Sequence, residues 1–271
     1  MITEMKMNRS LKLAAVLPLL LFVISGCATL GGQPLTIISP QEEIRLGQEL
    51  SAEIEKQEPV LNNPALNQYI TEVGNRVAAQ TQRPDIPYTF KIIDKDEVNA
   101  FALPGGPVYV YAGLLKYADN EAELASVLGH EVAHIVARHS AQQMTREFGY
   151  SLLASILLGQ DAGAAATVAA DVAGSLGMLK FSRNDEIEAD RLGLHYMFNA
   201  GYHPNAMVDF LTKLGELQSS NPSRVLNLLS THPLSQARVN TVSREIATLP
   251  PGKPVDFYTE RYQRIVGSAL K

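Results

Sequence analysis

The sequence has few of the residues that mark several protein classes. It contains one cysteine in 271 residues, Cys27, so no disulfide can form within the chain. It has no tryptophan, and its aromatic content is only 7%. The net charge is −5 without a long basic run, which argues against nucleic-acid binding because that function needs a positive surface. Hydrophobic residues still make up 46% of the chain, enough for one well-buried domain with small appendages.

The N-terminal apolar run is too short to cross a membrane. It reads LAAVLPLLLFVI and covers residues 13–24, whereas a helix that spans a bilayer needs about 20 apolar residues. Lys6, Arg9 and Lys12 precede the run. A basic start followed by a short apolar core is typical of a secretory signal. We therefore predict a signal peptide at residues 1–26.

Cys27 follows the apolar run in the sequence ISGC, which resembles the lipobox of bacterial lipoproteins. The alternative is a buried structural cysteine, but a position at the end of a signal core favours lipidation. The resemblance implies that Cys27 carries lipid at the mature N-terminus, with residues 27–38 as a flexible tether. Ala28 follows, rather than aspartate, which by the same resemblance implies an anchor in the outer membrane that faces the periplasm.

Beyond the tether, helix signals alternate with one short stretch of strand formers. Ser39-Pro40-Gln41-Glu42 has the composition of a capping box. We expect helices at about residues 39–56, 63–80, 120–134 and beyond, 184–201, 204–218 and 233–247. Strands are expected at residues 88–94 and within residues 98–115, on both sides of a Pro-Gly-Gly turn.

The remaining segments set the expected domain boundaries. Residues 151–180 are rich in small apolar residues, but Asp161 and Asp171 interrupt them, which disfavours a membrane span. We expect a mobile or packed segment there instead. A single domain is predicted at residues 39–249, followed by a short C-terminal extension at residues 250–271.

The stretch LGHEVAHIVARHS, residues 128–140, contains the pattern HExxH at His130, Glu131 and His134. Residues four apart share one face of a helix, so both imidazoles can bind one metal ion. A catalytic zinc ion uses three protein ligands and acidifies a water at its fourth position, to a pKa of about 7. Glu131 can take the proton of that water and pass it to a leaving amine. Because HExxH also occurs by chance, this prediction depends on a third ligand.

One source of a third ligand is excluded by the residues that follow. The extended motif HExxHxxGxxH would need glycine and histidine where the chain has Ala137 and Ser140. His139 comes five residues after His134, about 140° around a helix of 3.6 residues per turn. We therefore expect His139 to point away from the site, as a residue at the surface or behind the ligands.

A second source is the acidic stretch FSRNDEIEADRLG, residues 181–193. Glu186 and Asp190 are four apart and share a helix face, whereas Glu188 points elsewhere. A solvent-facing acidic helix is the alternative, but HExxH in the same chain favours Glu186 as the third ligand. Asp190 can then accept the ring N–H of a ligand histidine. Two imidazoles and one carboxylate suit zinc best.

Together these residues resemble the M48 family of zinc metallopeptidases, which combines HExxH with ExxxD. Two further stretches agree, NAFALPGGPVYVYAGLL before the helix and LSTHPLSQAR after it, and the resemblance covers about residues 40–248. It implies one zinc ion per chain. The residues that match the family are the zinc ligands His130, His134 and Glu186, the general base Glu131 and the supporting carboxylate Asp190.

The resemblance also implies where substrate binds. We expect an α+β fold, mostly helical, with a small antiparallel sheet over the HExxH helix. The NAFALPGG stretch matches the region beside the family's cleft, so its first residues, Asn99, Ala100, Phe101 and Ala102, are candidate substrate contacts. A strand edge there can pair with the backbone of an extended polypeptide, which gives weak sequence preference.

His232 is the remaining candidate. It precedes Pro233, so it can be a polar turn or N-cap residue, but it also matches the histidine of the family's HP motif. At the cleft it can donate a hydrogen bond to an oxyanion as a catalytic residue. It can also take the fourth metal position and keep the enzyme latent. We hypothesise such a gate, because the small-residue segment at 160–180 can move with it.

The leading prediction is a zinc metalloendopeptidase with a lipid anchor in the bacterial envelope. The implied substrates are misfolded or unassembled envelope proteins in extended form, and the outer-membrane assembly machinery is a candidate partner. One alternative is a chaperone or adaptor on a peptidase scaffold, although such a protein has no need for the base Glu131. Another is a zinc amidase acting on peptidoglycan, but no glycan-binding module is visible in the sequence.

Overall fold

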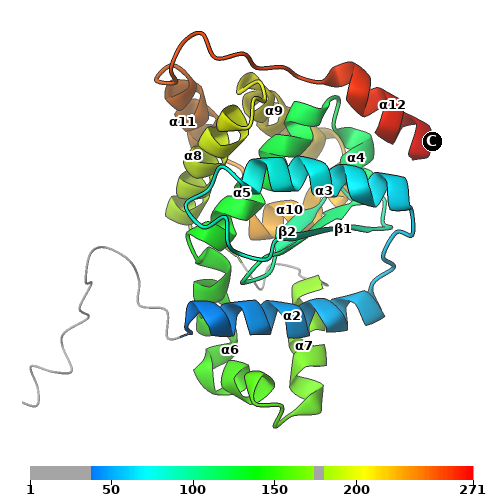
Figure 1. Cartoon of the computed structure of the whole chain (residues 1–271), viewed down its shortest axis with the longest axis vertical. Coiled ribbons are helices and arrows are strands. Elements are labelled where there is room, and N and C mark those ends of the chain that lie inside the picture. The colour runs from blue at the N-terminus through cyan, green and yellow to red at the C-terminus, as the bar shows by residue number, and fades with distance from the viewer. Residues whose placement is uncertain (1–37, 174–179, 271) are drawn as a thin grey trace, which may run out of the picture. The chain divides into compact units, whose positions relative to one another are not determined.

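The computed structural model describes residues 38–173 and 180–270. Helices dominate this part of the chain, and one small sheet lies among them (Figure 1), which confirms the predicted α+β class. The helices are α2 (Pro40–Gln57), α3 (Pro64–Ala78), α4 (Ala112–Tyr117), α5 (Glu121–Val136), α6 (His139–Leu157), α7 (Ala162–Ala173), α8 (Arg183–Asn199), α9 (Asn205–Ser220), the 3₁₀ helix η1 (Pro222–Val225), α10 (Leu226–Thr231), α11 (Gln236–Ile246) and α12 (Thr259–Ala269).

The sheet is mixed rather than antiparallel. Its strands are β1 (Thr89–Ile93), β2 (Ala100–Ala102) and β3 (Pro107–Tyr111), in the order β1-β3-β2. β2 and β3 form the expected hairpin and pair antiparallel. The expectation for the whole sheet was wrong because β1 joins the other side of β3 in parallel. Val60 forms a bridge with Ile93 of β1, so among the described residues β2 is the edge without a further partner strand.

The sheet separates two apolar cores because its side chains alternate between two faces. Val108 and Val110 of β3 belong to a core with α3, α5, α8 and α9. Tyr109 and Tyr111 point the other way, into a core with α2, α6 and α7. Figure 1 shows α2, α6 and α7 together on one side of the strands.

Helix α2 begins as the capping box predicted. The Ser39 hydroxyl accepts from the backbone N–H of Glu42, and the Glu42 carboxylate accepts from Ser39 N at 2.7 Å. Ile38, expected in the tether, is 1% exposed, and its carbonyl accepts a hydrogen bond from Arg138. The last residue of the expected tether is therefore part of the packed domain. The predicted signal peptide, Cys27 and the rest of the tether lie outside the described residues.

The expected C-terminal extension contributes to the first core. Tyr262 and Val266 of α12 are only 1% and 2% exposed. The Tyr262 hydroxyl also donates to the carbonyl of Leu115 at 2.6 Å. Residues 250–270 therefore complete the domain that carries the HExxH helix.

The small-residue segment contributes to the second core. Its described part forms the end of α6 and all of α7, with Val168 and Ala169 fully buried. Within the described ranges, no helix combines the length and the apolar character that crossing a bilayer requires.

The contact between α5 and α8 sets the position of the site. A Cβ atom on Gly193 would lie 2.8 Å from the backbone carbon of Gly129 and 2.8 Å from the nitrogen of His130. A Cβ on Gly129 would lie 3.0 Å from the carbonyl oxygen of Gly193. Only a residue without Cβ fits at Gly193, so the two backbones touch. This close crossing brings the first turns of α8 beside the HExxH residues of α5.

Candidate metal centre

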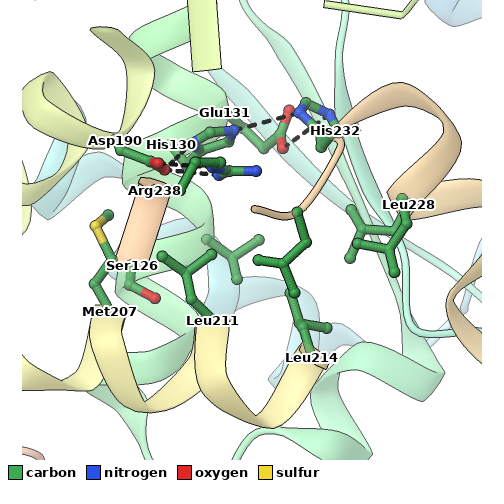
Figure 2. A pocket seen from close by; sticks show the side chains of 13 residues that line it. Ser126, His130, Glu131, Asp190, Met207, Leu211, Leu214, Leu228, His232 and Arg238 are labelled. Carbon is green, nitrogen blue, oxygen red and sulfur yellow. Dashed lines mark hydrogen bonds and ion pairs between the residues drawn. The ribbon is translucent and has the colours of Figure 1, made fainter. Parts of the chain in front are cut away.

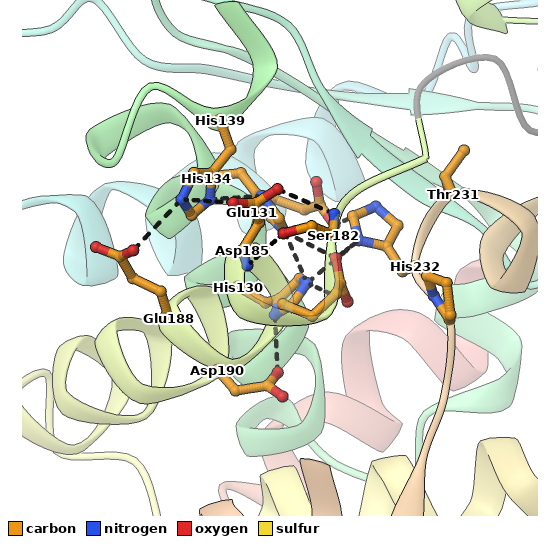
Figure 3. A network of polar contacts seen from close by, with 12 residues as sticks. His130, Glu131, His134, His139, Ser182, Asp185, Glu188, Asp190, Thr231 and His232 are labelled. Atoms are coloured by element: carbon orange, nitrogen blue, oxygen red, sulfur yellow. Dashed lines mark hydrogen bonds and ion pairs between the residues drawn. The ribbon is translucent and has the colours of Figure 1, made fainter. Parts of the chain in front are cut away.

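Three segments bring donor atoms together in one buried cluster (Figure 3). Helix α5 contributes His130 and His134 and the loop that follows α10 contributes His232, all three labelled in Figure 3. Helix α8 contributes Glu186. Each residue offers one ligand atom, and these atoms lie within 4.8 Å of one another. Residues more than 100 positions apart in the sequence therefore face a single point.

The spacing of these atoms fits a zinc ion. Nε2 of His130 lies 3.1 Å from Nε2 of His134 and 3.6 Å from Oε2 of Glu186. Oε1 of Glu186 lies 3.4 Å from Nε2 of His134. Zinc binds nitrogen and oxygen at about 2.0–2.2 Å in tetrahedral geometry, which separates neighbouring ligand atoms by about 3.3 Å. Both the donor types and their separations therefore match the predicted ligand set.

His232 lies inside the same cluster. Its Nδ1 is 3.0 Å from Oε1 of Glu186 and 3.3 Å from Nε2 of His130. The alternative of an N-cap residue is wrong, because Ser235 caps α11. Burial alone would lower the pKa of His232, but the carboxylates of Glu186 and Glu131 outweigh burial and raise the pKa.

Glu131 stands beside the cluster rather than within it. The residue is 2% exposed, and its Oε1 lies 3.7 Å from Nε2 of His232. It lines a pocket that also touches His130 and His232 (Figure 2). A carboxylate in this place is positioned to exchange a proton with a molecule that enters the pocket.

The outer nitrogen of His130 is held by a charged pair. Its Nδ1 lies 2.9 Å from Oδ1 of Asp190, as the spacing on α8 predicted. Arg238 of α11 donates two hydrogen bonds of 2.7 Å to Asp190, and its Nη1 lies 2.6 Å from Oε2 of Glu186. The sequence analysis gave Arg238 no role. The only sequence signal for it is its place at the end of LSTHPLSQAR.

The charges of this group support one another. Burial is the largest influence on the pKa of Asp190 and would raise it, but Arg238 and His130 outweigh burial and lower the pKa. Burial would also raise the pKa of Glu186, yet His232, Arg238 and His130 bring it well below its usual value. Both carboxylates are therefore ionised at neutral pH and can attract a cation.

The outer nitrogen of His134 meets a second histidine. Nδ1 of His139 lies 3.1 Å from Nδ1 of His134. His139 therefore lies behind the ligands, one of the two places expected for it, but the expectation that it points away was wrong because it assumed a continuous helix. Helix α5 ends at Val136, and Arg138 has a left-handed backbone with φ of 63°. This turn directs His139 back toward His134, where it is only 4% exposed.

Carboxylates lie behind His139 in turn. Oδ1 of Asp185 and Oε2 of Glu188 are 3.8 Å and 3.6 Å from its Nε2. Burial lowers the pKa of both His134 and His139, which favours neutral imidazoles on this side of the cluster. Phe181, which the sequence analysis did not single out, stacks on His134 with ring centroids 4.0 Å apart.

The predicted substrate strand β2 is the edge strand of the sheet in the described part of the chain and lies beside α5, with Ala100 0% and Ala102 7% exposed. The amide of Tyr111 donates to the carbonyl of Asn99, and the amide of Leu103 donates to that of Pro107. In an antiparallel pair this pattern alternates, so the backbone groups of Ala100 and Ala102 face the outer edge. Phe101 differs from its neighbours, because its side chain stacks on Tyr109 of the second core.

Comparison with known proteins gives consistent matches. The sequence model of Peptidase family M48 matches residues 64–246. The chain is 36% identical over 211 residues to the beta-barrel assembly-enhancing protease of Escherichia coli (strain K12), which covers 74% of this chain and 43% of that protein. It is 34% identical over 223 residues to the protein of the same name from Yersinia pestis, with coverages of 79% and 46%.

A eukaryotic relative matches the same part of the chain. The mitochondrial metalloendopeptidase OMA1 of Arabidopsis thaliana is 30% identical over 217 residues, 78% of this chain and 43% of that protein. The chain spans about half the length of the curated relatives that it matches. The family match covers more than half of the chain. It contains all four residues of the donor cluster and also Glu131. The chain therefore belongs to peptidase family M48.

Proposed function

We propose that this protein is a zinc-dependent endopeptidase that cleaves misfolded or unassembled proteins of the bacterial envelope. The observation that carries the proposal is the convergence of His130, His134 and Glu186 on one point, with the carboxylate of Glu131 beside it. Membership of peptidase family M48 supports the same chemistry.

In this proposal His130, His134 and Glu186 hold one zinc ion. When bound, zinc supplies Lewis acidity that polarises the scissile carbonyl and makes water a stronger acid. Glu131 takes a proton from the attacking water and delivers it to the leaving amine nitrogen. Nδ1 of His130 lies 2.9 Å from Asp190, so a proton on Nδ1 faces the carboxylate and the lone pair of Nε2 is left for the metal position. Arg238 keeps Asp190 ionised and oriented for this task.

Substrate docking is assigned to the outer edge of β2. Of the outward backbone groups, those of Ala100 are fully buried, so an extended chain would pair first at Ala102, which is 7% exposed. Such pairing reads the backbone and few side chains, so it selects chains that are locally unfolded. The substrate contacts predicted for Asn99 and Phe101 are then indirect, since Asn99 bonds to β3 and Phe101 packs on the opposite core.

His232 is assigned the role of a gate. Its Nδ1 lies 3.0 Å and 3.3 Å from two of the other donor atoms, which is the separation expected for a fourth ligand. In that state it holds the enzyme latent. If His232 is a gate, His232→Ala raises the rate of casein hydrolysis. If it instead donates to the oxyanion, the same substitution lowers the rate by about 10²–10³-fold. An unchanged rate would contradict both roles.

The location in the envelope rests on the sequence before residue 38. The basic start, the short apolar run and Cys27 support export, lipidation and an anchor in the outer membrane. Relatives named beta-barrel assembly-enhancing protease support a link to outer-membrane assembly. Mass spectrometry of the N-terminus of the protein isolated from membranes tests export and lipidation. A chain that keeps residues 1–26, or an unmodified Cys27, would contradict it.

The decisive experiment compares the full-length, zinc-loaded protein with Glu131→Gln. We expect the wild type to digest casein, and Glu131→Gln to bind the same amount of zinc while losing at least about 10²-fold of the rate. Glu49→Gln is the matched control, because Glu49 is an exposed carboxylate on α2. It should retain full activity.

The other outcomes separate the alternatives. If wild type and His232→Ala both hold zinc and neither digests casein, the protease proposal fails and a binding or adaptor role takes its place. If purified peptidoglycan is cleaved while casein is not, the protein is an amidase. If Glu131→Gln cleaves casein as fast as the wild type, Glu131 is not the base.

A further inference from the structure

The turn between α5 and α6 contains a backbone conformation that its residue does not favour. Arg138 has φ of 63°, in the left-handed region that glycine adopts easily and that other residues enter only at an energetic cost. Helices often end in this conformation, but the residue is then usually glycine. An arginine in its place points to a role for the arginine side chain.

The side chain of Arg138 is held by the start of α2. Its Nε donates to Oε1 of Glu43 at 2.5 Å, and its Nη2 donates to the carbonyl of Ile38. The backbone of Arg138 joins the two helices, because its amide donates to the carbonyl of Ile135 and its carbonyl accepts from the amide of Gln142. Helix α2 therefore holds the residue at which the chain changes direction between α5 and α6.

Glu43 reaches the end of α5 through a second arginine as well. Arg83 lies in the loop between α3 and β1, and its Nη2 is 3.9 Å from Oε2 of Glu43. Nη1 of Arg83 donates to the carbonyl of Ile135 at 3.4 Å, and Ile135 directly follows the ligand His134. A cation at the carbonyl end of a helix is favourable. Glu43 therefore gathers two arginines at the last turn of the HExxH helix.

Glu43 itself is buried and its backbone is fixed. The residue is 1% exposed. A Cβ atom on Gly105, in the turn between β2 and β3, would lie 2.5 Å from the carbonyl oxygen of Glu43, so this turn packs directly on α2. Burial outweighs Arg138 and Arg83 and raises the pKa of Glu43, so its ionised form is less favoured in the folded chain than in the unfolded one. The contact therefore fixes geometry rather than adding stability.

The turn at Arg138 determines where the next residue lies. That residue is His139, and its Nδ1 lies 3.1 Å from Nδ1 of His134 (Figure 3). Another backbone conformation at Arg138 would direct the His139 ring elsewhere, as a continuous helix would. The outer nitrogen of His134 would then lose its partner.

We propose that Glu43 is a positioning residue of the metal centre. It acts by holding Arg138 in the left-handed turn. The turn places His139 so that it orients the ring of His134 toward the metal. The inference rests on the zinc site of the proposed function and does not require that the protein cleaves peptides.

The test measures the zinc affinity of the full-length protein by competition with a chelator. Glu43→Met is similar in size but accepts hydrogen bonds only weakly, so zinc affinity should fall by about tenfold, the low end for supporting groups. Glu43→Gln keeps an acceptor oxygen for Arg138, and its affinity should stay within about threefold of wild type. Glu49→Met, an exposed change on α2, is the control and should leave the affinity unchanged.

Arg138→Gly separates positioning from packing. Glycine adopts the left-handed turn without a side chain to hold it, so this variant should bind zinc within about threefold of wild type. In the Arg138→Gly background, Glu43→Met should cause no further loss, because the contact that it breaks no longer exists. If Glu43→Met lowered zinc affinity by the same factor in both backgrounds, packing would explain the loss and the positioning role would be overturned.

The outcomes also separate this inference from the proposed endopeptidase. If Glu43→Met binds zinc as tightly as the wild type, the positioning role is overturned while the endopeptidase stands. If the wild type binds zinc but digests no casein, the endopeptidase fails, and the zinc affinities still decide the role of Glu43. A wild type that binds no zinc would overturn both.

A second variant covers the case in which Glu43→Met does not fold, as judged by urea unfolding. Glu43→Asp keeps the charge but withdraws the carboxylate from Arg138 by one methylene group. Its zinc affinity should also fall, and the loss should disappear in the Arg138→Gly background. An affinity equal to that of the wild type would count against the positioning role.

Discussion

The two histidines of α5 face the same metal position, but their outer nitrogens are held in different ways. Nδ1 of His130 lies beside the carboxylate of Asp190, which Arg238 holds with two hydrogen bonds. Nδ1 of His134 meets Nδ1 of another imidazole, His139. One side of the cluster is therefore held by opposite charges and the other by neutral rings.

The two sides of the cluster differ in what fixes the position of the ring proton on His130 and on His134. A carboxylate only accepts hydrogen bonds, so Asp190 leaves His130 a single choice of tautomer. His139 accepts from His134 only when its own proton sits on Nε2, toward Asp185 and Glu188. Hydrogen bonds to charged groups are also stronger than those between neutral groups. The charged side should therefore matter more, both for stability and for metal binding.

The largest effect is expected from Arg238→Met. This change leaves the buried carboxylates of Asp190 and Glu186 without their cation, and breaking a buried pair typically costs about 3–5 kcal/mol. Urea unfolding of the metal-free protein measures it. Arg244→Met, an exposed change on the same helix, should stay within about 0.5 kcal/mol of wild type.

The pH dependence of this effect follows from the lowered pKa values of Asp190 and Glu186. Their stabilising contribution is fully present above the unfolded pKa values of about 3.9 and 4.3. It is lost as the pH falls through the lower values of the folded state. The difference between wild type and Arg238→Met should shrink in that acidic range. If Arg238→Met lowered the free energy of unfolding by less than about 1 kcal/mol at pH 7, a supporting role for the charged side would be contradicted.

A smaller effect is expected from Asp190→Asn. The amide has nearly the same shape, but its NH₂ group faces the donors of Arg238 and no longer carries charge toward His130. Loss of such a supporting group typically weakens metal binding by about 10–100-fold. Competition with a zinc chelator measures the change, with the exposed Asp209→Asn on α9 as the control. Equal zinc affinity for Asp190→Asn and wild type would remove Asp190 from the metal centre.

The smallest effect is expected from substitutions of His139. In His139→Leu the N–H of His134 loses its acceptor, and zinc affinity should fall by about tenfold, the low end for supporting groups. In His139→Gln the side-chain oxygen can accept the same hydrogen bond, so affinity should stay within about threefold of wild type. If the two variants lost affinity equally, packing rather than hydrogen bonding would explain the role of His139.

The contact of Asp190 with His130 could be predicted from the sequence, whereas the contact of His139 with His134 could not. Asp190 was found because it lies one turn from Glu186 on the same helix, and residues four apart share a face whatever surrounds them. A place behind the ligands was one expectation for His139, but its direction was predicted wrongly because the same rule was extended past Val136, where the helix ends. No local pattern marked the left-handed turn at Arg138, since arginine rarely adopts it.

The fold shows the same division. The start of α2 followed from Ser39 and Glu42, whose hydrogen bonds are local. The parallel pairing of β1 with β3 did not follow, because it joins strands that are not neighbours in the sequence. The pocket beside Glu131 was equally invisible, since its walls come from four separate segments.

The sequence by itself therefore determined where most helices begin, which residues can face a metal together and which chemistry they suit. These properties depend on contacts within a few positions, where helical geometry is known in advance. Only the tertiary structure decided that Arg238 holds Asp190, that His232 enters the donor cluster and that leucines of α9 line a pocket beside Glu131. These contacts join distant segments, and the close crossing of α5 and α8 at Gly129 and Gly193 brings the metal-facing parts of both helices within reach.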